Sequence, residues 1–341
     1  MKIILDAMGG DNAPEAIVRG AVDALSSYKD FSVILVGKQD VLRELLSGMT
    51  HDPERVEIIN ANEVIEMCES PAAAIRKKKD SSMVVGLTAL SQGRGDIFIS
   101  AGNTGALVAG GTLIVRRIEG VKRPAIATQL PSRTGSVLLM DGGANVDCKP
   151  AWLAQFGVMG SVYMQKVMGI TDPKVGLVNN GAEEEKGNLL TKEAYQLMKN
   201  TPVNFSGNAE GRDLLSGMYD VIVCDGFTGN IILKFLEGTA GVIMGTLKES
   251  IMKKTMSKIG AIFMKSAFRD LKKKFDYSEY GGALLLGLRG GVMKAHGSSD
   301  AKAVASAVKM ARRFILGDVV QNIKDQIEQT GAAGEPDESE D

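Results

Sequence analysis

The chain is poor in the residues that build disulfide frameworks and structural metal sites. It has three cysteines, Cys68, Cys148 and Cys224, which is an odd number and too few for a disulfide framework in a chain of 341 residues. It has two histidines, His51 and His296, far apart in the sequence, and no pair of cysteines spaced as in a zinc motif. We therefore expect a protein of a reducing compartment that uses no metal and no cofactor.

Net charge and aromatic residues are also scarce. Forty basic and 41 acidic residues leave a formal net charge of −1, and aromatic residues make up 5% of the chain. Neither value indicates a nucleic-acid partner. The longest uncharged run, 97–115, reaches the length of a membrane span, but its asparagine, hydroxyl residues and glycines favour a strand, a loop and a buried helix. With no apolar core of a signal peptide after Met1, a cytoplasmic protein is expected.

Glycine, by contrast, is abundant, and much of it follows short apolar runs. Forty glycines occur. Runs typical of strands lie at 2–5, 32–36, 56–59, 96–100, 136–140, 175–178, 203–205 and 221–224. Most of them lead into clusters of Gly, Asn and Asp, with helical patterns beginning at Pro14 and near Asp40 among others. This alternation predicts an α/β fold: a three-layer α/β/α sandwich with a mainly parallel sheet, built as one large domain over 1–330.

The glycine clusters are the predicted binding loops. Ligands of such folds lie beyond the carboxyl ends of the strands, and we expect all the clusters to meet at that one edge. Backbone N–H groups and helix N-termini there suit phosphate or another small anion. The sequence lacks a P-loop, a dinucleotide fingerprint after its first strand and a GxSxG elbow, which argues against ATP, NAD and serine-hydrolase chemistry.

Two lysines and a histidine are candidates for charge and proton chemistry. Lys186 precedes a helix start beside a glycine loop, where it would neutralise a phosphate; its alternative is a solvated surface lysine. Lys234, one turn into a helix, has the same two interpretations. His296 stands at the entrance of the last long helix, which Ser298 or Ser299 would cap. Ligand contact and acid/base work remain open for this histidine.

Three aspartates and two cysteines have less reactive interpretations. Asp6, Asp141 and Asp225 each follow an apolar strand and either cap helices and turns or fix loops around a ligand. Because a carboxylate repels phosphate, we assign them positioning roles. Cys224 ends a buried strand and behaves as a small hydrophobe. Cys148, beside a lysine, is better placed for a lowered pKa, but an inert role is favoured for both thiols.

Six segments in order and spacing resemble the bacterial phosphate acyltransferases of phospholipid synthesis: LDAMGGDNAP, ISAGNTGA, DGGANVDCKP, NNGAEEEKGN, CDGFTGN and KAHGSSD. The resemblance runs from Met1 to about Val320. It implies transfer of a fatty acyl group from acyl carrier protein to inorganic phosphate, giving acyl phosphate, by a homodimer. It also implies a fold like those of phosphotransacetylase and the isocitrate/isopropylmalate dehydrogenases. Asn12 replaces a histidine expected in the first motif, and DGGAN stands where DVGAN occurs, so position 12 carries no acid/base role.

The loops and the resemblance together define the predicted site. Phosphate attacks the thioester directly, without an acyl-enzyme; Lys186 contacts phosphate or the carrier arm, and His296 protonates the leaving thiolate. The predicted substrate- and phosphate-binding residues are Asp6, Gly9, Gly10, Asp11, Ser100, Gly102, Asn103, Thr104, Gly105, Asp141, Asn145, Asn180, Gly187, Asn188, Asp225, Thr228, Gly229, Asn230, Lys234 and Ser298.

A basic helical arm is expected over about 240–276. Between 253 and 275, eight basic residues and one acidic residue give a net charge of +7, and apolar residues from Met256 to Phe275 step by three or four along one helical face. The predicted contact residues are Ile259, Ile262, Phe263 and Phe268. They would meet an anionic membrane near the downstream glycerol-3-phosphate acyltransferase, the acyl carrier protein or a second copy of the chain. The acidic tail, 331–341, is expected to be disordered.

Three other functions remain open at this point. A phosphotransacetylase-like enzyme would use a CoA thioester in place of the carrier protein. A dehydrogenase of the isopropylmalate type would need a set of metal-binding aspartates and a ribose-reading acid, for which no convincing spacing exists. A non-catalytic phospholigand-binding protein would bind without turnover.

Overall fold

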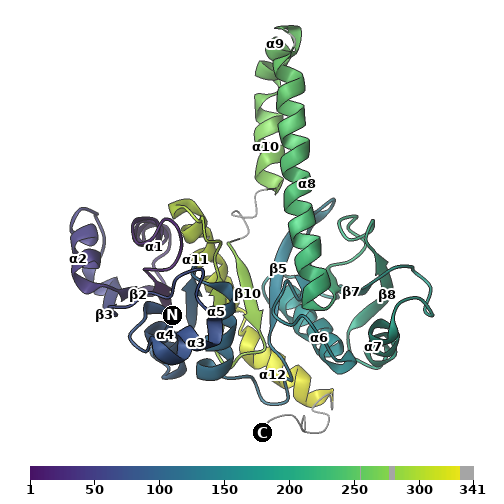
Figure 1. The fold of residues 1–341 in the computed structure, drawn as a ribbon, viewed down its shortest axis with the longest axis horizontal. Helices are drawn as coiled ribbons and strands as arrows, with labels where there is room; N and C mark the ends of the chain where they lie inside the picture. Colours follow the sequence, from purple (N-terminus) through teal and green to yellow (C-terminus); the bar gives the residue numbers. More distant parts are fainter. Residues whose placement is uncertain (254, 276–280, 331–341) are drawn as a thin grey trace.

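One sheet runs through the middle of the molecule (Figure 1). The structure is a computed structural model that describes residues 1–253, 255–275 and 281–330, without the side chains of residues 262, 270 and 272–275. Within these residues the strand order is β3-β2-β1-β4-β11-β10-β5-β6-β9-β7-β8. The strands are β1 (Lys2–Asp6), β2 (Ser32–Gly37), β3 (Val56–Asn60), β4 (Ile97–Ser100), β5 (Ala125–Ser132), β6 (Gly135–Met140), β7 (Lys174–Asn179), β8 (Asn204–Glu210), β9 (Val221–Val223), β10 (Ala283–Leu286) and β11 (Gly291–Lys294).

Helices cover both faces of the sheet, which confirms the three-layer prediction. Along β1, Ile3 and Leu5 pack into one apolar core and Ile4 into the other, as the alternation of a strand requires. One face carries α1 (Glu15–Ser27), α2 (Gln39–Ser47), α6 (Pro150–Lys166), α7 (Leu189–Lys199), α11 (Ala301–Leu316) and α12 (Val319–Gln329). The other carries α3 (Pro71–Lys77), α4 (Ser82–Ser91), α5 (Thr104–Gly110) with the π-helical turn Gly111–Val115, and the start of α8 (Gly226–Met252).

The parallel strands form two groups that run in opposite directions. Strands β3, β2, β1, β4 and β11 are mutually parallel, as are β6, β9, β7 and β8. Between the groups, β10 and β5 pair antiparallel to each other and to their outer neighbours. The prediction that all the glycine loops share one edge is therefore wrong, because these antiparallel pairs reverse the strand direction midway across the sheet.

Most predicted strands are present, and the differences have local causes. The run at 203–205 continues as strand through Glu210, because Asn208 and Ala209 are buried beside β7. Strands β5, β10 and β11 were not predicted. The last two have four residues each, and β5 contains a proline, so none shows the long apolar run typical of a buried parallel strand.

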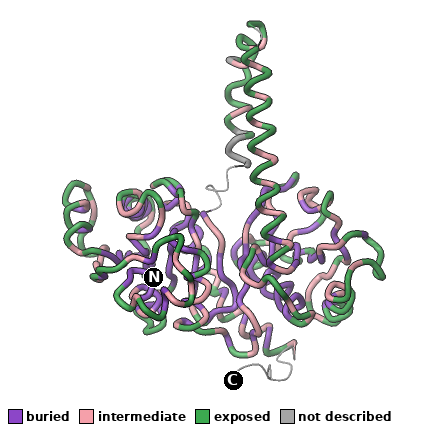
Figure 2. The backbone as a smooth tube through the Cα atoms, in the orientation of Figure 1, coloured by how far each residue is buried: buried purple, intermediate pink, exposed green. Residues whose placement is uncertain are grey.

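A helical arm projects from the body (Figures 1 and 2). Helix α8 rises from the sheet, α9 (Thr255–Phe263) turns back against it, and α10 (Lys265–Phe275) leads back toward the body. By length and composition α8 passes as a membrane-spanning helix, and none of its most apolar stretch is buried. The predicted arm is confirmed as helical but begins earlier, at α8. The Ile262 side chain and the 331–341 tail lie outside the described residues.

Candidate functional site

Three neighbouring parallel strands end in polar side chains that lie side by side. The register places Lys294, the last residue of β11, beside Ser100, the last residue of β4, and β1 ends alongside with Asp6. The Ser100 hydroxyl donates to Asp6 Oδ2 at 2.6 Å and accepts from the Gly102 N–H at 3.0 Å. We call these three side chains and the loops that follow them the central cluster.

The loops of the central cluster are joined by backbone contacts. The Asp11 N–H donates to the Gly297 carbonyl at 2.8 Å, and Asn12 Nδ2 donates to the Ser298 and Ser299 carbonyls at 3.1 and 3.3 Å. Asn12 therefore joins the loop after β1 to the loop before α11. At Gly9 a side chain would collide with the Asp6 carboxylate and the Gly102 nitrogen, so only glycine allows this approach.

Burial shifts the pKa values of both charged groups at the strand ends. Burial raises the pKa of the Asp6 carboxyl, while hydrogen bonds from Ser100, Ser82 and two backbone N–H groups oppose the shift. Burial lowers the pKa of the Lys294 ammonium to about 8, although Asp6 and Asp11 favour its charged form. The sequence motifs include Lys294 as the first residue of KAHGSSD, but its isolated position in a strand gave no reason to single it out.

His296 belongs to the central cluster and is predominantly neutral at pH 7. Its pKa is lowered from the ordinary value of 6.5, first by burial and then by the nearby Lys294 ammonium. The ring Nδ1 lies 2.8 Å from the Ser298 hydroxyl and 3.3 Å from the Ser298 nitrogen, which donates to it, so the neutral ring carries its proton on Nε2. The charges of Glu237 and Lys234 on α8 also act on this pKa, in opposite directions.

The cap of the last long helix differs from the prediction. Asp300, rather than Ser298 or Ser299, accepts a hydrogen bond from the Ala303 N–H at 2.8 Å and begins α11. The shift follows from the binding of Ser298 to His296, which leaves the aspartate as the side chain nearest the free N–H groups of the first turn.

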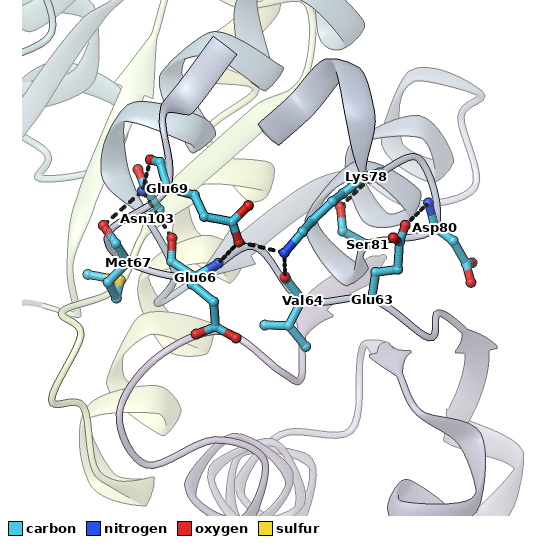
Figure 3. A network of polar contacts seen from close by, with 9 residues as sticks. All are labelled: Glu63, Val64, Glu66, Met67, Glu69, Lys78, Asp80, Ser81 and Asn103. Carbon is cyan, nitrogen blue, oxygen red and sulfur yellow. Dashed lines mark hydrogen bonds and ion pairs between the residues drawn. The ribbon is translucent and has the colours of Figure 1, made fainter. Parts of the chain in front are cut away.

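Asn103 holds a loop beside the central cluster (Figure 3). Its Oδ1 caps α5 by accepting from the Ala106 N–H, and its Nδ2 donates to the carbonyls of Glu66, Met67 and Glu69. Lys78 fixes the same loop from the other side, because its ammonium donates to Glu69 Oε1 at 2.5 Å and to the Val64 carbonyl at 2.7 Å. With its polar atoms engaged in this way, the buried Asn103 positions the loop.

The opposite-running group of strands builds a second cluster around Asp141. This fully buried carboxylate accepts hydrogen bonds from the N–H groups of Ile126, Gly143, Ala144 and Asn145 and from Asn145 Nδ2. Burial raises the pKa of this carboxyl, while hydrogen bonds from Ile126, Ala144 and Asn145 act to lower it. The neighbouring strand β9 leads into α8, whose N-cap is Asp225. Asp141 therefore holds the loop that follows its strand, and Asp225 caps a helix, which are the two roles that the sequence left open for these aspartates. The second cluster also contains the predicted residues Thr228, Gly229 and Asn230, at the start of α8.

Lys186 lies in a third loop, which follows β7. Its side chain is exposed and lies 4.0 Å from Glu183 of the same loop. Asn188 caps α7, and Gly187 adopts a φ of +103°, which a side chain would strain. Asn180 is exposed in the same loop. Within the described part of the chain, no hydrogen bond or ion pair joins this loop to the central cluster.

The predicted site residues therefore separate into three loop clusters. The central cluster unites Asp6, Gly9, Gly10, Asp11, Ser100, Gly102, Asn103, His296 and Ser298, with Thr104 and Gly105 exposed at the start of α5. Lys234 is exposed and pairs with Glu237 on α8 at 3.0 Å. The roles of all these residues in binding and catalysis remain predictions.

The cysteines fit the inert interpretation. Burial raises the pKa of Cys148 to about 12, so a lowered pKa beside Lys149 is not found. Burial also raises the pKa of Cys224 well above its ordinary value. Neither thiol forms the thiolate that a nucleophile requires near neutral pH.

Comparison with known proteins shows the same fold and a full-length family match. Residues 1–322 match the family model described as fatty acid synthesis protein. The phosphate acyltransferase of Caldanaerobacter subterraneus subsp. tengcongensis is 50% identical over 331 residues, 97% of this chain and 98% of the relative.

Solved structures extend the likeness of fold. A phosphotransacetylase from Streptococcus pyogenes aligns with a TM-score of 0.62 and 18% identity over 94% of each chain. A protein described as a 4-hydroxythreonine-4-phosphate dehydrogenase, from Salmonella typhimurium, aligns with a TM-score of 0.51 and 13% identity over 92% of this chain and 98% of the other. These neighbours confirm the predicted fold class. On the full-length match, this chain belongs to the fatty acid synthesis protein family and, within it, to the phosphate acyltransferases.

Proposed function

We propose that the protein transfers a fatty acyl group from acyl carrier protein to inorganic phosphate and releases acyl phosphate for phospholipid synthesis. The observation that carries this proposal is the match of nearly the whole chain to phosphate acyltransferases at about half identity. The central cluster supports it, since it combines close-approaching glycine loops with the half-buried Lys294 ammonium at one set of strand ends.

The proposed step is a direct displacement. An oxygen of hydrogen phosphate attacks the thioester carbonyl carbon, a carbon–oxygen bond forms, and the carbon–sulfur bond breaks. The thiolate leaves with the proton that hydrogen phosphate gives up, and His296 passes this proton on. Phosphate is already nucleophilic, so positioning and stabilisation of the oxyanion account for the catalysis. The raised pKa values of Cys148 and Cys224 support a route without an acyl-enzyme.

The arm supports the carrier protein as acyl donor and a second copy as partner. It presents Lys253, Lys258, Lys265 and Arg269 on exposed helix surface, which suits an acidic carrier protein by electrostatic steering. Large apolar side chains are exposed along the length of α8, among them Phe235 at 74% and Val242 at 68%. We propose that a second copy covers this surface in a homodimer.

The arm tip is proposed to contact an anionic membrane. Met256, Ile259 and Phe263 lie on one exposed face of α9, with Phe263 83% exposed, and the basic residues flank this face. Such a helix lies in the headgroup region with its apolar face inserted. This contact would deliver acyl phosphate to the membrane-bound glycerol-3-phosphate acyltransferase that consumes it, from a cytoplasmic enzyme.

The donor and product are tested together. The purified protein is incubated with long-chain acyl carrier protein or with the matching acyl-CoA, each with and without phosphate, and the product is trapped as hydroxamate. We expect phosphate-dependent product and free carrier thiol, with the carrier protein preferred. A preference for acyl-CoA would favour the phosphotransacetylase-like alternative. Turnover with neither donor would contradict the proposal and favour a phospholigand-binding protein.

A further inference from the structure

Among the described residues, Lys294 is a half-buried cation with no carboxylate in contact with its ammonium. Its ammonium donates to the Ala101 carbonyl at 3.1 Å and to the Ala295 carbonyl. Within the described residues, these neutral carbonyls are its hydrogen-bond partners, and no carboxylate lies within ion-pair distance of it. An ammonium has three N–H donors, so one remains for another acceptor.

The surroundings make this arrangement costly unless an anion binds. Lys294 is half-buried, and the resulting desolvation disfavours its charged form. Proteins compensate such a charge by pairing it or by using it in function. The charged groups that face Lys294 are Asp6 at the end of β1 and Asp11 in the following loop, with His296 on its own loop. The Asp6 carboxylate is engaged by Ser100 and by backbone N–H groups, so it does not replace a bound anion.

The position of Lys294 matches that of a ligand contact. It ends the strand that lies beside β4 in the parallel group, and its two carbonyl partners belong to the loops after β4 and β11. The glycine loop after β1 closes the same cluster, with Gly10 held against Ala101 and the Gly297 carbonyl. The ammonium is thus fixed at the strand ends where ligands of this fold class bind.

We propose that the Lys294 ammonium binds the phosphate dianion through its remaining N–H and provides the positive charge of the phosphate subsite. This inference deepens the proposed function and rests on it for the identity of the anion. Lys186, which is exposed and paired within its own loop, is then left to contact the carrier arm.

Sulfate binding tests the role of Lys294 without any acyl donor. Sulfate stays a dianion across the range used, so a change in its affinity with pH reports on the protein. Because the ammonium loses its proton near pH 8, we expect native affinity to fall at least about tenfold between roughly pH 7 and pH 9.5. Isothermal titration calorimetry provides the measurement.

Three variants separate charge from packing. Lys294→Met and Lys294→Gln are expected to bind sulfate at least about tenfold more weakly at neutral pH, although glutamine keeps a donor for the carbonyls. Lys294→Arg keeps a charge that does not titrate and should bind without the alkaline fall. Lys309→Met, an exposed lysine on α11, is the matched control and should bind like the native protein.

Two results would overturn the inference. One is sulfate affinity in Lys294→Gln equal to that of the native protein, since the carbonyl contacts alone would then explain the lysine. The other is an alkaline fall in Lys294→Arg identical to the native one. If Lys294→Met fails to fold, the pH dependence of sulfate affinity in Lys294→Arg still tests the inference. Loss of sulfate binding in these variants without acyl transfer by the native protein would disprove the proposed function while leaving the inference standing.

Discussion

At the residue scale, similar side chains do different work according to what surrounds them. Asp141 and Asp225 both follow strands of the second group, yet Asp141 is fully buried and accepts five hydrogen bonds, whereas Asp225 is half-buried and caps a helix. Their spacing from the preceding strand is alike, so sequence alone could not separate them. The distinction depends on which N–H groups the fold brings to each carboxylate.

The two aspartates should respond differently to the same substitution. Asp141→Asn places an amide NH₂ among N–H donors in a buried site, and we expect the free energy of unfolding to fall by about 2–4 kcal/mol. Asp225→Asn retains a good capping residue and should cost less than about 0.5 kcal/mol. Urea denaturation of both variants provides the measurement. Equal losses of unfolding free energy in the two variants would show that the five hydrogen bonds of Asp141 stabilise the fold no more than the helix cap of Asp225.

The His296 pKa should depend on Lys294. Proton NMR of the native protein should place the His296 midpoint below 6.5, and Lys294→Met should raise it, because a nearby positive charge disappears. The folded protein binds this proton less tightly than the unfolded chain, so His296 lowers the stability as the pH falls below about 6.5. An unchanged midpoint in Lys294→Met would contradict the coupling.

At the element scale, the central cluster depends on a loop held from two sides. Asn103 binds the 66–69 loop through three carbonyls, and Lys78 binds it through Glu69 and Val64. The Lys78 ammonium lowers the pKa of Glu69, so this carboxylate is charged at neutral pH. The glycines near Asn103 suggested an anion loop, but its amide is engaged with the backbone of a segment more than 30 residues away.

Two asparagine caps offer a matched test of that loop. Asn103→Ala removes the cap of α5 and the three hydrogen bonds that hold the 66–69 loop, and we expect a loss of about 2–4 kcal/mol together with faster hydrogen exchange at 66–69. Asn188→Ala removes the exposed cap of α7 and should cost about 1 kcal/mol. Similar costs for both, with unchanged exchange at 66–69, would rule out the anchoring role.

The limits of prediction are clear from particular elements. Apolar runs followed by glycine clusters predicted β1, β2, β4, β6, β7 and β9, because a buried parallel strand needs continuous hydrophobicity. The sequence did not predict the short strands β10 and β11. It therefore also missed the reversal of strand direction across the sheet and the position of Lys294 at a strand end. Long-range pairing decides these features, and no local pattern encodes it.

At the scale of the whole molecule, the arm exposes a long run of apolar side chains that no other part of the described chain covers. Its exposed apolar side chains extend from Phe235 of α8 to Phe263, the last residue of α9. Figure 2 shows that the buried residues lie in the body, whereas the described residues of the projecting arm are exposed or intermediate. Exposed apolar surface of this extent marks an interaction site. The lower and upper parts are proposed to have different partners.

Charge substitutions should separate those partners. Phe235→Glu is expected to weaken the homodimer at least about tenfold in analytical ultracentrifugation, since a buried charge at an interface is costly. Phe263→Glu should leave the dimer intact but abolish co-sedimentation with anionic vesicles. Met218→Glu, exposed on the body, is the control for both. A dimer unaffected by Phe235→Glu would exclude the lower arm from the interface.

Phosphorus NMR of a reaction containing acyl carrier protein thioester and inorganic phosphate tests the proposed reaction most directly. An acyl phosphate resonance should appear and grow in step with free carrier thiol, and thiol release should stop when phosphate is omitted. Thiol release at the same rate without phosphate would instead show hydrolysis by water and contradict acyl transfer to phosphate.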